Sequence, residues 1–313
     1  MGNSADNPTL SFIIVSYNVK DLLRNCLQSI MDNVRVSCEV IVVDNASTDN
    51  SAMMVKSEFP KIHLVSNTHN TGFSAANNQA IRISKGSFLF FLNPDTELND
   101  PSINTFFNSY CSVSENSVIA GPRLLNTDGS FQESAWKYPS PLQHFTELLF
   151  LHRLLRLSSY RHLMRKPVAQ VNFVSGAALL ISRQSALDLN GFDEDLFWMD
   201  DVDLCRRLQL SGGKTEYFSS SSVVHHSGQS SKKNFNIQIS NQIISKLKFY
   251  KKHSQFVSFI FSVIILFLHI VSRILIFFVL SLINISYLKK CRAYLFTFRK
   301  FFQFLIIGKL SVT

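Results

Sequence analysis

The sequence predicts an α/β fold with a mostly parallel central sheet, followed by a helical tail. Through the first half of the chain, short apolar runs alternate with segments of helical spacing, which is typical of βαβ units. Three apolar runs each lead into a carboxylate. From residue 217 onward the chain contains 13 Lys and Arg residues and no Asp or Glu. We therefore expect a sheet domain with an acidic edge and a tail of different chemistry.

The alternation of strand and helix signals starts at Leu10 and continues to Leu92. We predict strands where apolar, β-branched and aromatic residues run together, and helices where apolar residues recur every three or four positions. The predicted strands are 10–17, 39–44, 62–65 and 87–92, with helices at 20–31, 47–56 and 73–83 between them. This order favours a doubly wound sheet, for which 118–120 is a candidate fifth strand.

The middle of the chain carries turn signals and shorter elements. Asn126-Thr127-Asp128-Gly129 is typical of a hairpin turn. We expect a strand at 173–181, which Gly176 interrupts, and a short helix at 201–210 with acids in its first turn, as the helix dipole favours. Helical spacing at 143–157 and late strands at 215–218 and 223–226 complete the predicted elements.

The acidic residues after the apolar runs mark the expected ligand site. Asp44 follows the run 39–43, Asn93-Pro94-Asp95 follows 88–92, and Asp200-Asp201 follows 196–199. We interpret all three runs as strands, and ligands of open α/β sheets bind beyond the C-terminal ends of the strands. Clustered carboxylates repel one another unless a cation lies among them. A divalent metal ion carrying a phosphate is the expected occupant.

Each candidate residue has both a functional and a structural interpretation. Asp44 accepts hydrogen bonds from a nucleobase or ribose beside the Tyr17 ring, or caps a helix. Asp95 binds Mg²⁺ or Mn²⁺ with diphosphate and water, or forms an Asn-Pro-Asp turn. One of Asp200 and Asp201 is a general base and the other orients it, or both cap a helix. His225 completes a metal shell or is structural.

The overall charge of +9 belongs to the tail, because residues 1–216 hold 18 basic and 22 acidic residues. The basic residues flank apolar runs and do not alternate with exposed aromatic residues, which argues against nucleic-acid binding. The five cysteines form no CxxC pair, which argues against a zinc site and a disulfide framework.

We predict a domain boundary near residue 236, giving a sheet domain over 1–236 and a membrane-associating tail over 237–313. Residues 256–288 are almost wholly apolar, and Arg273 divides them into pieces of 17 and 15 residues. About 20 apolar residues cross a bilayer. Because basic residues flank both ends, a hairpin or an in-plane pair of helices fits the positive-inside rule better than one span. The alternative is a buried helical hairpin in a soluble protein.

Seven segments between residues 9 and 235 together resemble, in order and spacing, the motifs of the inverting family 2 glycosyltransferases. The bacterial rhamnosyltransferase-like branch, which builds O-antigen and other cell-surface polysaccharides, is the most similar. The resemblance implies a GT-A fold, a nucleotide-diphosphate sugar donor and a divalent cation, Mg²⁺ or Mn²⁺. The segments are SFIIVSYN, VIVVDNASTDNS, NTGFSAANNQAI, FLFFLNPDTEL, VSGAALLISR, GFDEDLFWMDDVDLCRRLQLSGGK and VVHHSGQS.

The resemblance also implies roles for individual residues. Asp95 resembles the last residue of the metal-binding DxD motif, and the first acid of that motif is replaced by Asn93. Asp200-Asp201 occupies the place of the family's Glu-Asp pair, whose second member resembles the catalytic base. His225 matches the histidine that helps to hold metal or diphosphate. The residues that the resemblance places around the nucleotide sugar are Tyr17, Asn18, Asp44, Asn45, Asn77, Asn93 and Asp95.

The expected activity is transfer of a sugar, with inversion, from the nucleotide donor to a lipid-linked saccharide. By resemblance the favoured donor is dTDP-rhamnose, and the expected acceptor is a polyprenyl-diphosphate saccharide at the cytoplasmic face of the bacterial inner membrane. A polyprenyl-phosphate sugar transferase and a non-catalytic membrane scaffold are the alternatives. A nucleotidyltransferase is disfavoured because no Gly-rich loop follows the first strand, and a dinucleotide-dependent oxidoreductase because no GxGxxG motif follows an early strand.

Overall fold

The computed structural model describes residues 8–113, 117–151, 160, 166–226 and 235–307. The chain divides into two compact units. The first, here called the sheet unit, contains residues 1–136, 160–194 and 200–230. The second, the helical unit, contains residues 137–159, 195–199 and 231–313. The helical unit therefore takes in two segments that precede the tail, while the predicted boundary near residue 236 stays a prediction.

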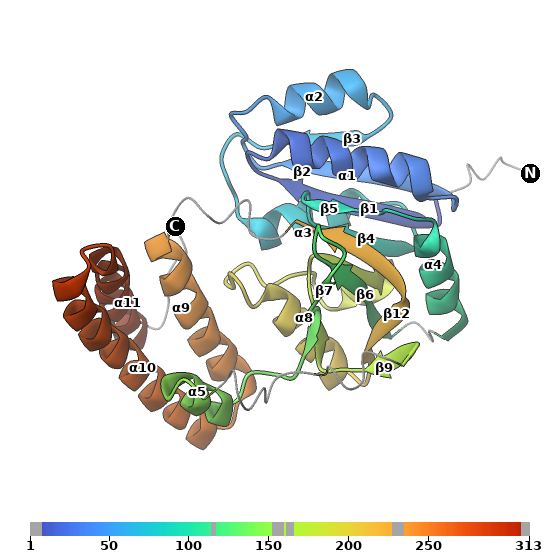
Figure 1. Ribbon diagram of the computed structural model, residues 1–313. Helices are drawn as coiled ribbons and strands as arrows, with labels where there is room; N and C mark the ends of the chain where they lie inside the picture. The colour runs from blue at the N-terminus through green and yellow to red at the C-terminus, as the bar shows by residue number, and fades with distance from the viewer. Residues whose placement is uncertain (1–7, 114–116, 152–159, 161–165, 227–234, 308–313) are drawn as a thin grey trace, which may run out of the picture. The chain divides into compact units, whose positions relative to one another are not determined.

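The sheet unit is built on one large sheet, in the strand order β3-β2-β1-β4-β11-β6-β12-β5 (Figure 1). Strands β1, β2, β3 and β4 are parallel, as the alternating pattern predicts. The strands on this path are β1 (Leu10–Ser16), β2 (Cys38–Asp44), β3 (His63–Ser66), β4 (Phe88–Leu92), β5 (Thr96–Glu97), β6 (Val118–Leu125), β11 (Ala178–Ser182) and β12 (Lys214–His225).

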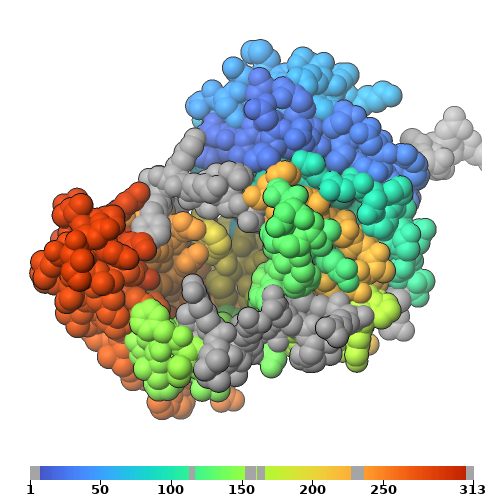
Figure 2. All heavy atoms as spheres, in the orientation of Figure 1, coloured from blue at the N-terminus to red at the C-terminus, as the bar shows by residue number. Residues whose placement is uncertain are grey.

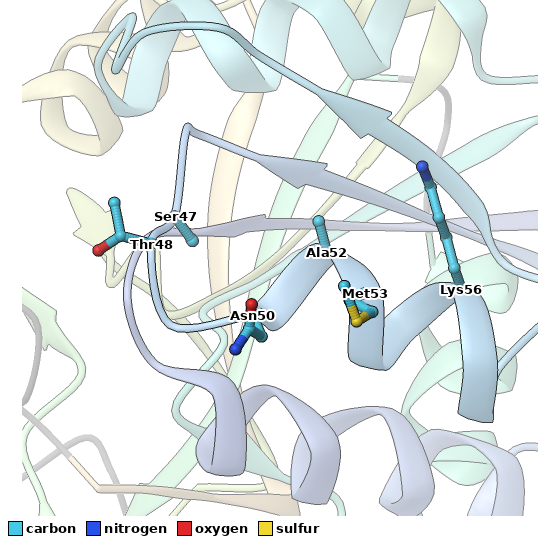
Figure 3. A pocket seen from close by; sticks show the side chains of 6 residues that line it. All are labelled: Ser47, Thr48, Asn50, Ala52, Met53 and Lys56. Atoms are coloured by element: carbon cyan, nitrogen blue, oxygen red, sulfur yellow. The ribbon is translucent and has the colours of Figure 1, made fainter.

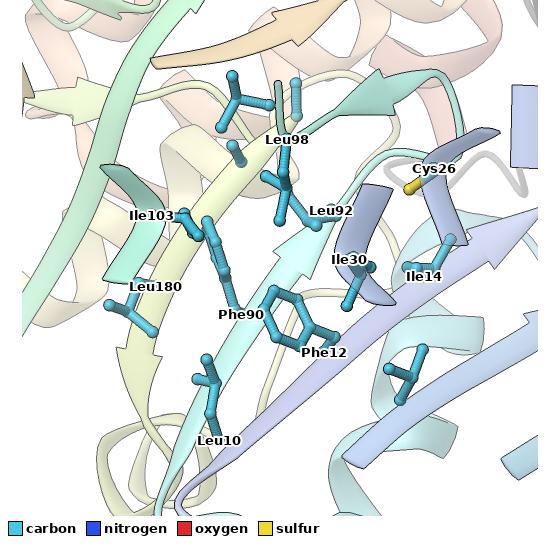
Figure 4. Close-up of a cluster of buried hydrophobic side chains, with 14 of the residues drawn as sticks. Leu10, Phe12, Ile14, Cys26, Ile30, Phe90, Leu92, Leu98, Ile103 and Leu180 are labelled. Atoms are coloured by element: carbon cyan, nitrogen blue, oxygen red, sulfur yellow. The ribbon is translucent and has the colours of Figure 1, made fainter. Parts of the chain in front are cut away.

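Helices cover both faces of this sheet. Those of the first face are α1 (Lys20–Asn33), α2 (Ser51–Glu58) and α4 (Ser102–Val113), and those of the second are α3 (Phe73–Ile83), α7 (Arg183–Asp188) and α8 (Asp200–Leu210). Side chains alternate along each strand, so Phe12 and Ile14 of β1 lie in the first core, with Phe90 (Figure 4). Ile13 lies in the second core. Each fully buried side chain of this size contributes about 1.5–3 kcal/mol.

Two features of the sheet differ from the expectations. β11 is antiparallel to β4 and to β6, so it interrupts the parallel order. The two late strands are one bulged strand, β12, whose register with β6 shifts between Phe218 and Ser222. The candidate fifth strand at 118–120 is present as the first part of β6. The predicted hairpin is also present, since β6 pairs antiparallel with β7 (Phe131–Gln132) across the turn at 126–129.

The segment 196–199 is not a strand, which corrects our interpretation of that apolar run. It forms an irregular loop in which Trp198 has a left-handed φ of 82°. Its apolar residues include the buried Leu196 and Met199, so packing rather than strand pairing explains the run. The predicted strand 173–181 is divided at the glycine, into β10 (Phe173–Val174) and β11. The other short strands are β8 (Ala135–Trp136) and β9 (Val168–Gln170).

The helical unit contains α5 (Pro141–Leu148), α9 (Phe235–His253), α10 (Phe256–Ile283) and α11 (Tyr287–Ile307). Of the helix predicted at 143–157, residues 152–157 lie outside the described residues. α10 continues through Arg273, and the chain turns only at 284–286, so the predicted break at Arg273 is wrong. The reason is that Arg273 is buried and donates to the Glu147 carbonyl of α5 at 2.8 Å, so its charge does not interrupt the helix.

Candidate active site

The C-terminal ends of β1, β2 and β4 meet at one edge of the sheet. Ser16, the last residue of β1, pairs in register with Asp44, the last residue of β2. Leu92, the last residue of β4, pairs with Ile14 of β1. The predicted donor-binding segments 17–18, 44–45 and 93–95 therefore follow neighbouring strands. Two strand spacings, about 10 Å, separate the ends of β2 and β4.

Asp44 is buried, and only one of its carboxylate oxygens is paired. Oδ2 accepts a hydrogen bond from the Ser47 amide at 3.1 Å. Oδ1 and the hydroxyl of Ser16 are buried without a hydrogen-bond partner among the described residues. A buried unpaired polar group costs about 1–3 kcal/mol, so this is where a ligand's donor group is expected. α2 begins at Ser51, after Asn50, so Asp44 does not cap that helix.

Tyr17 and Asn18 shape the rim beside Asp44. The Tyr17 side chain is 42% exposed at this edge. Asn18 has φ 55°, a left-handed conformation that Asn tolerates. The side-chain oxygen of Asn18 accepts hydrogen bonds from the backbone amide of Thr48 at 2.8 Å and from the Thr48 hydroxyl at 3.1 Å. The backbone amide of Asn18 donates to Ser47 Oγ at 3.0 Å. Asn18 thus joins the loops that follow β1 and β2, while the Tyr17 ring stays open to a ligand.

The amides of Asn45 and Asn77 serve the scaffold. Asn45 Oδ1 accepts from the Thr71 amide at 3.0 Å and from Asn67 Nδ2 at 3.1 Å, and its Nδ2 donates to Asn70 Oδ1 at 2.8 Å. Asn77 is buried in α3 and donates to the Phe73 carbonyl at 2.9 Å. Both side chains hold the β3–α3 loop and the start of α3. Their direct contact with a nucleotide sugar stays a prediction.

Asp95 and His225 face each other across the turn between β4 and β5. Asp95 is 4% exposed, and its Oδ1 lies 3.4 Å from Nε2 of His225, the last residue of β12. Asn93 Nδ2 lies 3.5 Å from the same ring nitrogen. His225 Nδ1 lies 2.7 Å from Gln132 Oε1. The DxD-like turn therefore lies against the late histidine, while a metal ion shared by Asp95 and His225 stays a prediction.

Gln132 fixes which nitrogen of His225 carries a proton. Gln132 Nε2 donates to Asn126 Oδ1 at 2.8 Å and to the His225 carbonyl at 3.2 Å, so its Oε1 must be the atom that faces Nδ1. Nδ1 is then the donor, and Nε2 is the ring nitrogen that faces the Asp95 carboxylate. An imidazole nitrogen and a carboxylate that face each other are a suitable pair of ligands for a cation, and ligating histidines are typically oriented by such an outer hydrogen bond.

The donor set fits a metal ion that takes most of its ligands from substrate and water. No group of three or more His, Cys, Asp or Glu side chains suited to a metal ion occurs within the described residues. One carboxylate and one imidazole leave most positions of a six-coordinate Mg²⁺ or Mn²⁺ shell open, as is usual where substrate phosphates supply oxygens.

Asp200 and Asp201 begin α8 and have different surroundings. Asp200 is buried, and its Oδ2 accepts from Ser74 Oγ at 3.4 Å. Asp201 Oδ2 accepts from the Gly176 amide at 2.8 Å and its Oδ1 from the Val202 amide at 2.8 Å. A Cβ at residue 176 would lie 3.3 Å from Asp201 Cβ, so glycine permits this close approach. Asp201 is thereby held in one orientation.

Burial raises the pKa of both carboxyl groups of this pair. At Asp200 the neighbouring charge of Asp201 raises the pKa further. At Asp201 the amides of Gly176 and Val202 oppose the effect of burial, because they bind the anion. Asp201 is therefore the member that carries the negative charge more readily.

Residues 175–177 join the two acidic clusters. The Asn93 amide donates to the Ala177 carbonyl at 3.0 Å, and the adjacent Gly176 amide donates to Asp201. Asp201 is thus one peptide unit away from the backbone that pairs with the Asn93-Pro94-Asp95 turn. This route joins Asn93 to Asp201, and the side-chain contacts of His225 join it to Asn93 and Asp95.

A shallow hollow of about 350 Å³ lies beside this edge, lined by residues of the β2–α2 loop and α2 (Figure 3). Its lining is Ser47, Thr48, Asn50, Ala52, Met53 and Lys56. None of the acidic candidates lines it, so the hollow does not define the site by itself.

Sequence reasoning missed Gln132, Ser16 and Ser74. Gln132 lies in a two-residue strand without a local pattern, so only its pairing with β6 brings it to His225. Ser16 could have been predicted from the sequence, because it is a polar residue at the end of an apolar strand, as Asp44 is. In the structure the two residues pair in register. Ser74 is distant in sequence from Asp200, and nothing local points to their contact.

Comparisons with known proteins bear on this geometry. A family model described as Glycosyl transferase family 2 matches residues 11–186. An N-acetylglucosaminyl-diphospho-decaprenol L-rhamnosyltransferase of Mycobacterium tuberculosis is 27% identical over 237 residues, which are 71% of this chain and 77% of that protein.

Solved structures of glycosyltransferases share the fold. The mannosyltransferase PcManGT from Pyrobaculum calidifontis, in complex with GDP-Man and Mn²⁺, has a TM-score of 0.59 at 15% identity, covering 95% of this chain and 86% of that one. GalNAc-T7 with UDP, GalNAc and Mn²⁺ has a TM-score of 0.53 at 16% identity, covering 71% of this chain and only 44% of that one. The predicted GT-A fold class and the resemblance stated from the sequence are confirmed.

Proposed function

Because the chain belongs to glycosyltransferase family 2, we propose that it transfers rhamnose, with inversion, from dTDP-rhamnose to a lipid-linked saccharide. The observation that carries the chemistry is the join at residues 175–177, where Gly176 holds Asp201 and Ala177 pairs with Asn93. The similar rhamnosyltransferase, named for an N-acetylglucosaminyl-diphospho-decaprenol acceptor, supports the donor and acceptor classes.

We propose that the donor nucleotide lies along the edge from β2 to β4. Asp44 Oδ1 and Ser16 Oγ are the buried unpaired atoms that would bind the base or ribose, with the Tyr17 ring beside them. The distance of two strand spacings, about 10 Å, leads from there to Asp95, where the diphosphate belongs.

Asp95 and His225 would hold a divalent cation, Mg²⁺ or Mn²⁺, with Gln132 orienting the imidazole. When bound, the cation neutralises negative charge on the departing diphosphate. Asn93 directly follows β4, and its side-chain Nδ2 lies 3.5 Å from His225 Nε2. We therefore propose that the side-chain amide of Asn93 contacts the donor.

We propose Asp201 as the general base. Each of its oxygens accepts one backbone N–H, and a carboxylate has further lone pairs with which to take the proton of an acceptor hydroxyl. A carboxylate whose pKa is raised above its ordinary value is a better general base near neutral pH. Asp200 lies next to it against Ser74 and keeps the pair's negative charge on Asp201. One displacement without a covalent intermediate inverts the anomeric centre.

The acceptor and location follow from the tail. We propose that 1–236 is the catalytic domain and that 237–313 associates with the cytoplasmic face of the bacterial inner membrane, in O-antigen or related cell-surface polysaccharide synthesis. Among the described residues, α10 alone is long and apolar enough to cross a membrane, and little of it is buried. A polyprenyl-diphosphate acceptor is embedded in that membrane, so an enzyme that uses it is expected to bind there.

The test uses purified full-length protein with labelled dTDP-rhamnose, Mn²⁺ or Mg²⁺ and two acceptors, polyprenyl-diphosphate N-acetylglucosamine and polyprenyl phosphate. Transfer to polyprenyl-diphosphate N-acetylglucosamine supports the proposal. Transfer to polyprenyl phosphate itself would indicate the alternative lipid-phosphate transferase. No transfer and no hydrolysis with any of several nucleotide sugars, despite a donor-induced rise in melting temperature, would indicate a non-catalytic scaffold.

A further inference from the structure

The helical unit exposes an apolar surface on α10 that runs along the whole helix. Buried residues Ser262, Leu266, Ile270 and Arg273 form one stripe of α10. The other side is apolar and exposed from the first turn to the last. α11, whose atoms lie at the surface in Figure 2 (red), adds the exposed Leu295, Phe296, Phe302, Leu305, Ile306 and Ile307. The exposed apolar residues of α10 are Phe256, Val257, Ile260, Phe261, Ile264, Leu268, Leu275, Phe278, Val279, Leu282 and Ile283.

Some of the unit's basic residues flank α10 at each end. Lys251 and Lys252 precede α10, and Lys289, Lys290 and Arg292 follow it. No acid occurs after Glu216. An anionic lipid headgroup layer complements this distribution, and each basic residue near such a layer contributes about 1 kcal/mol. The occupant that fits the surface is therefore a lipid leaflet with anionic headgroups.

The packing of α9 and α11 determines how α10 meets that leaflet. A crossing α10 would send α9 and α11 to opposite sides of the membrane, since they are connected to its two ends. They are instead side by side with the middle of α10 and with each other (Figure 1). One core cluster contains Ile243, Ile244 and Leu247 of α9, Leu266 and Ile270 of α10, and Phe301 and Phe304 of α11.

A crossing arrangement would therefore place all three helices in hydrocarbon. α9 carries Lys246 and Lys248 among its core residues, and α11 carries Arg299 and Lys300 near its middle. Each charge at the bilayer centre costs about 2.5–3.5 kcal/mol. α10 is also about 42 Å long at 1.5 Å per residue, well over a hydrocarbon thickness of about 30 Å.

α5 adds a second restraint at the middle of α10. Arg273 donates to the Glu147 carbonyl and stacks on the Phe150 ring, 3.7 Å from its centre. Arg273 thus binds the C-terminal end of α5, where cations are favoured. A crossing α10 would carry α5 and the turn at residues 149–151 to mid-membrane, where lipid-exposed irregular backbone does not occur.

We propose that α10 lies in the plane of the membrane, inserted into one leaflet by its exposed apolar face, with both ends on the same side. This deepens the membrane part of the proposed function and rests on it. α9 and α5 then stay on the aqueous side of α10, and the basic residues at both ends meet the headgroups of the same leaflet.

The test measures sidedness in the full-length protein expressed in bacterial membranes. The exposed thiols of Cys38 and Cys111 are replaced by Ser, and single reporters are introduced as Gln255→Cys and Ser286→Cys, exposed residues at the two ends of α10. A further variant, in which only Cys38 is replaced, keeps the exposed thiol of Cys111 and reports the side on which the sheet unit lies. Each is treated with a membrane-impermeant maleimide in inside-out vesicles and in spheroplasts.

Labelling of both reporters from the same side as Cys111 supports the in-plane arrangement. Labelling of Gln255→Cys and Ser286→Cys from opposite sides would overturn it while leaving membrane association intact. Failure of the purified protein to sediment with phosphatidylglycerol-containing vesicles would overturn both the arrangement and the membrane part of the proposed function. Sugar transfer to a detergent-dispersed acceptor is measured on the same variants, so that loss of catalysis is distinguished from either result.

Discussion

Asp201→Asn is the substitution that tests the proposed general base most directly. It preserves size but removes the carboxylate that takes the acceptor's proton. General-base catalysis contributes typically about 10²- to 10⁴-fold. At 1.36 kcal/mol per tenfold in rate, this corresponds to about 2.7–5.4 kcal/mol of activation free energy. We expect that loss in turnover, with donor binding retained.

The structure also sets the stability cost of the same substitution. Both oxygens of Asp201 accept backbone N–H groups, from Gly176 and Val202. An Asn side chain has one oxygen, so one of these amides would face an NH₂ group and lose its partner. The expected loss in free energy of unfolding is about 1–3 kcal/mol. It is smaller than the kinetic effect and is measured separately by thermal or urea unfolding.

The assay compares single-turnover rates at saturating donor and acceptor, with donor affinity from calorimetry. Asp188→Asn, on the exposed end of α7, is the matched control and should leave both unchanged. Near-normal turnover in Asp201→Asn would remove that residue from the role of base. A large loss in Asp200→Asn with little in Asp201→Asn would assign the base to the neighbouring carboxylate.

Three further outcomes are expected. The raised pKa of Asp200 means that the folded state binds the extra proton, so the free energy of unfolding falls as pH rises from about 4 through the raised pKa. This fall should be smaller in Asp200→Asn, and urea unfolding across pH measures it, with an unchanged slope refuting the assignment. Gln132→Ala should weaken Mn²⁺ binding in the presence of donor about 10- to 100-fold, because His225 loses its orienting partner. If calorimetry shows unchanged Mn²⁺ affinity in Gln132→Ala, Gln132 does not orient His225 for metal binding. Replacing Lys289 and Lys290 by Gln should weaken binding to anionic vesicles about fivefold per residue at low salt, and equal sedimentation of the variant would contradict the electrostatic part of the anchor.

The sequence predicts the parallel half of the sheet and its ligand edge because both depend on local patterns. Strands β1, β2 and β4 are apolar runs, and helices α1 and α3 between them are amphipathic. Asp44 ends β2, and Asp95 follows β4 after Asn93 and Pro94. The antiparallel insertion of β11 between β4 and β6 was not predicted, because register between distant strands leaves no local trace. The loop 196–199 was wrongly assigned because a short buried apolar run has the same composition in a loop as in a strand.

Site residues divide in the same way. Asp95, His225 and Asp201 are predicted as site residues because they stand at or near the ends of elements and within a resemblance. Gln132 was not found, because its role comes from tertiary contact with the imidazole of His225. Asn45 shows the converse case: the motif indicates donor binding, while its amide holds the loop that follows β3.

One basic residue of the tail, Lys246, pairs with an acid from an earlier part of the chain. No acid follows Glu216 in sequence, but Glu147 of α5 lies 3.2 Å from Lys246 of α9 and 3.0 Å from His144. Burial opposes ionisation of Glu147, and its neighbours outweigh that effect, so its pKa is held below the usual range. Deleting residues 237–313 would therefore remove the partner of a largely buried carboxylate as well as the apolar surface. A truncated protein that aggregates or leaves the membrane would report both changes at once, whereas the reporters at residues 255 and 286 leave Glu147 paired and isolate the membrane contact.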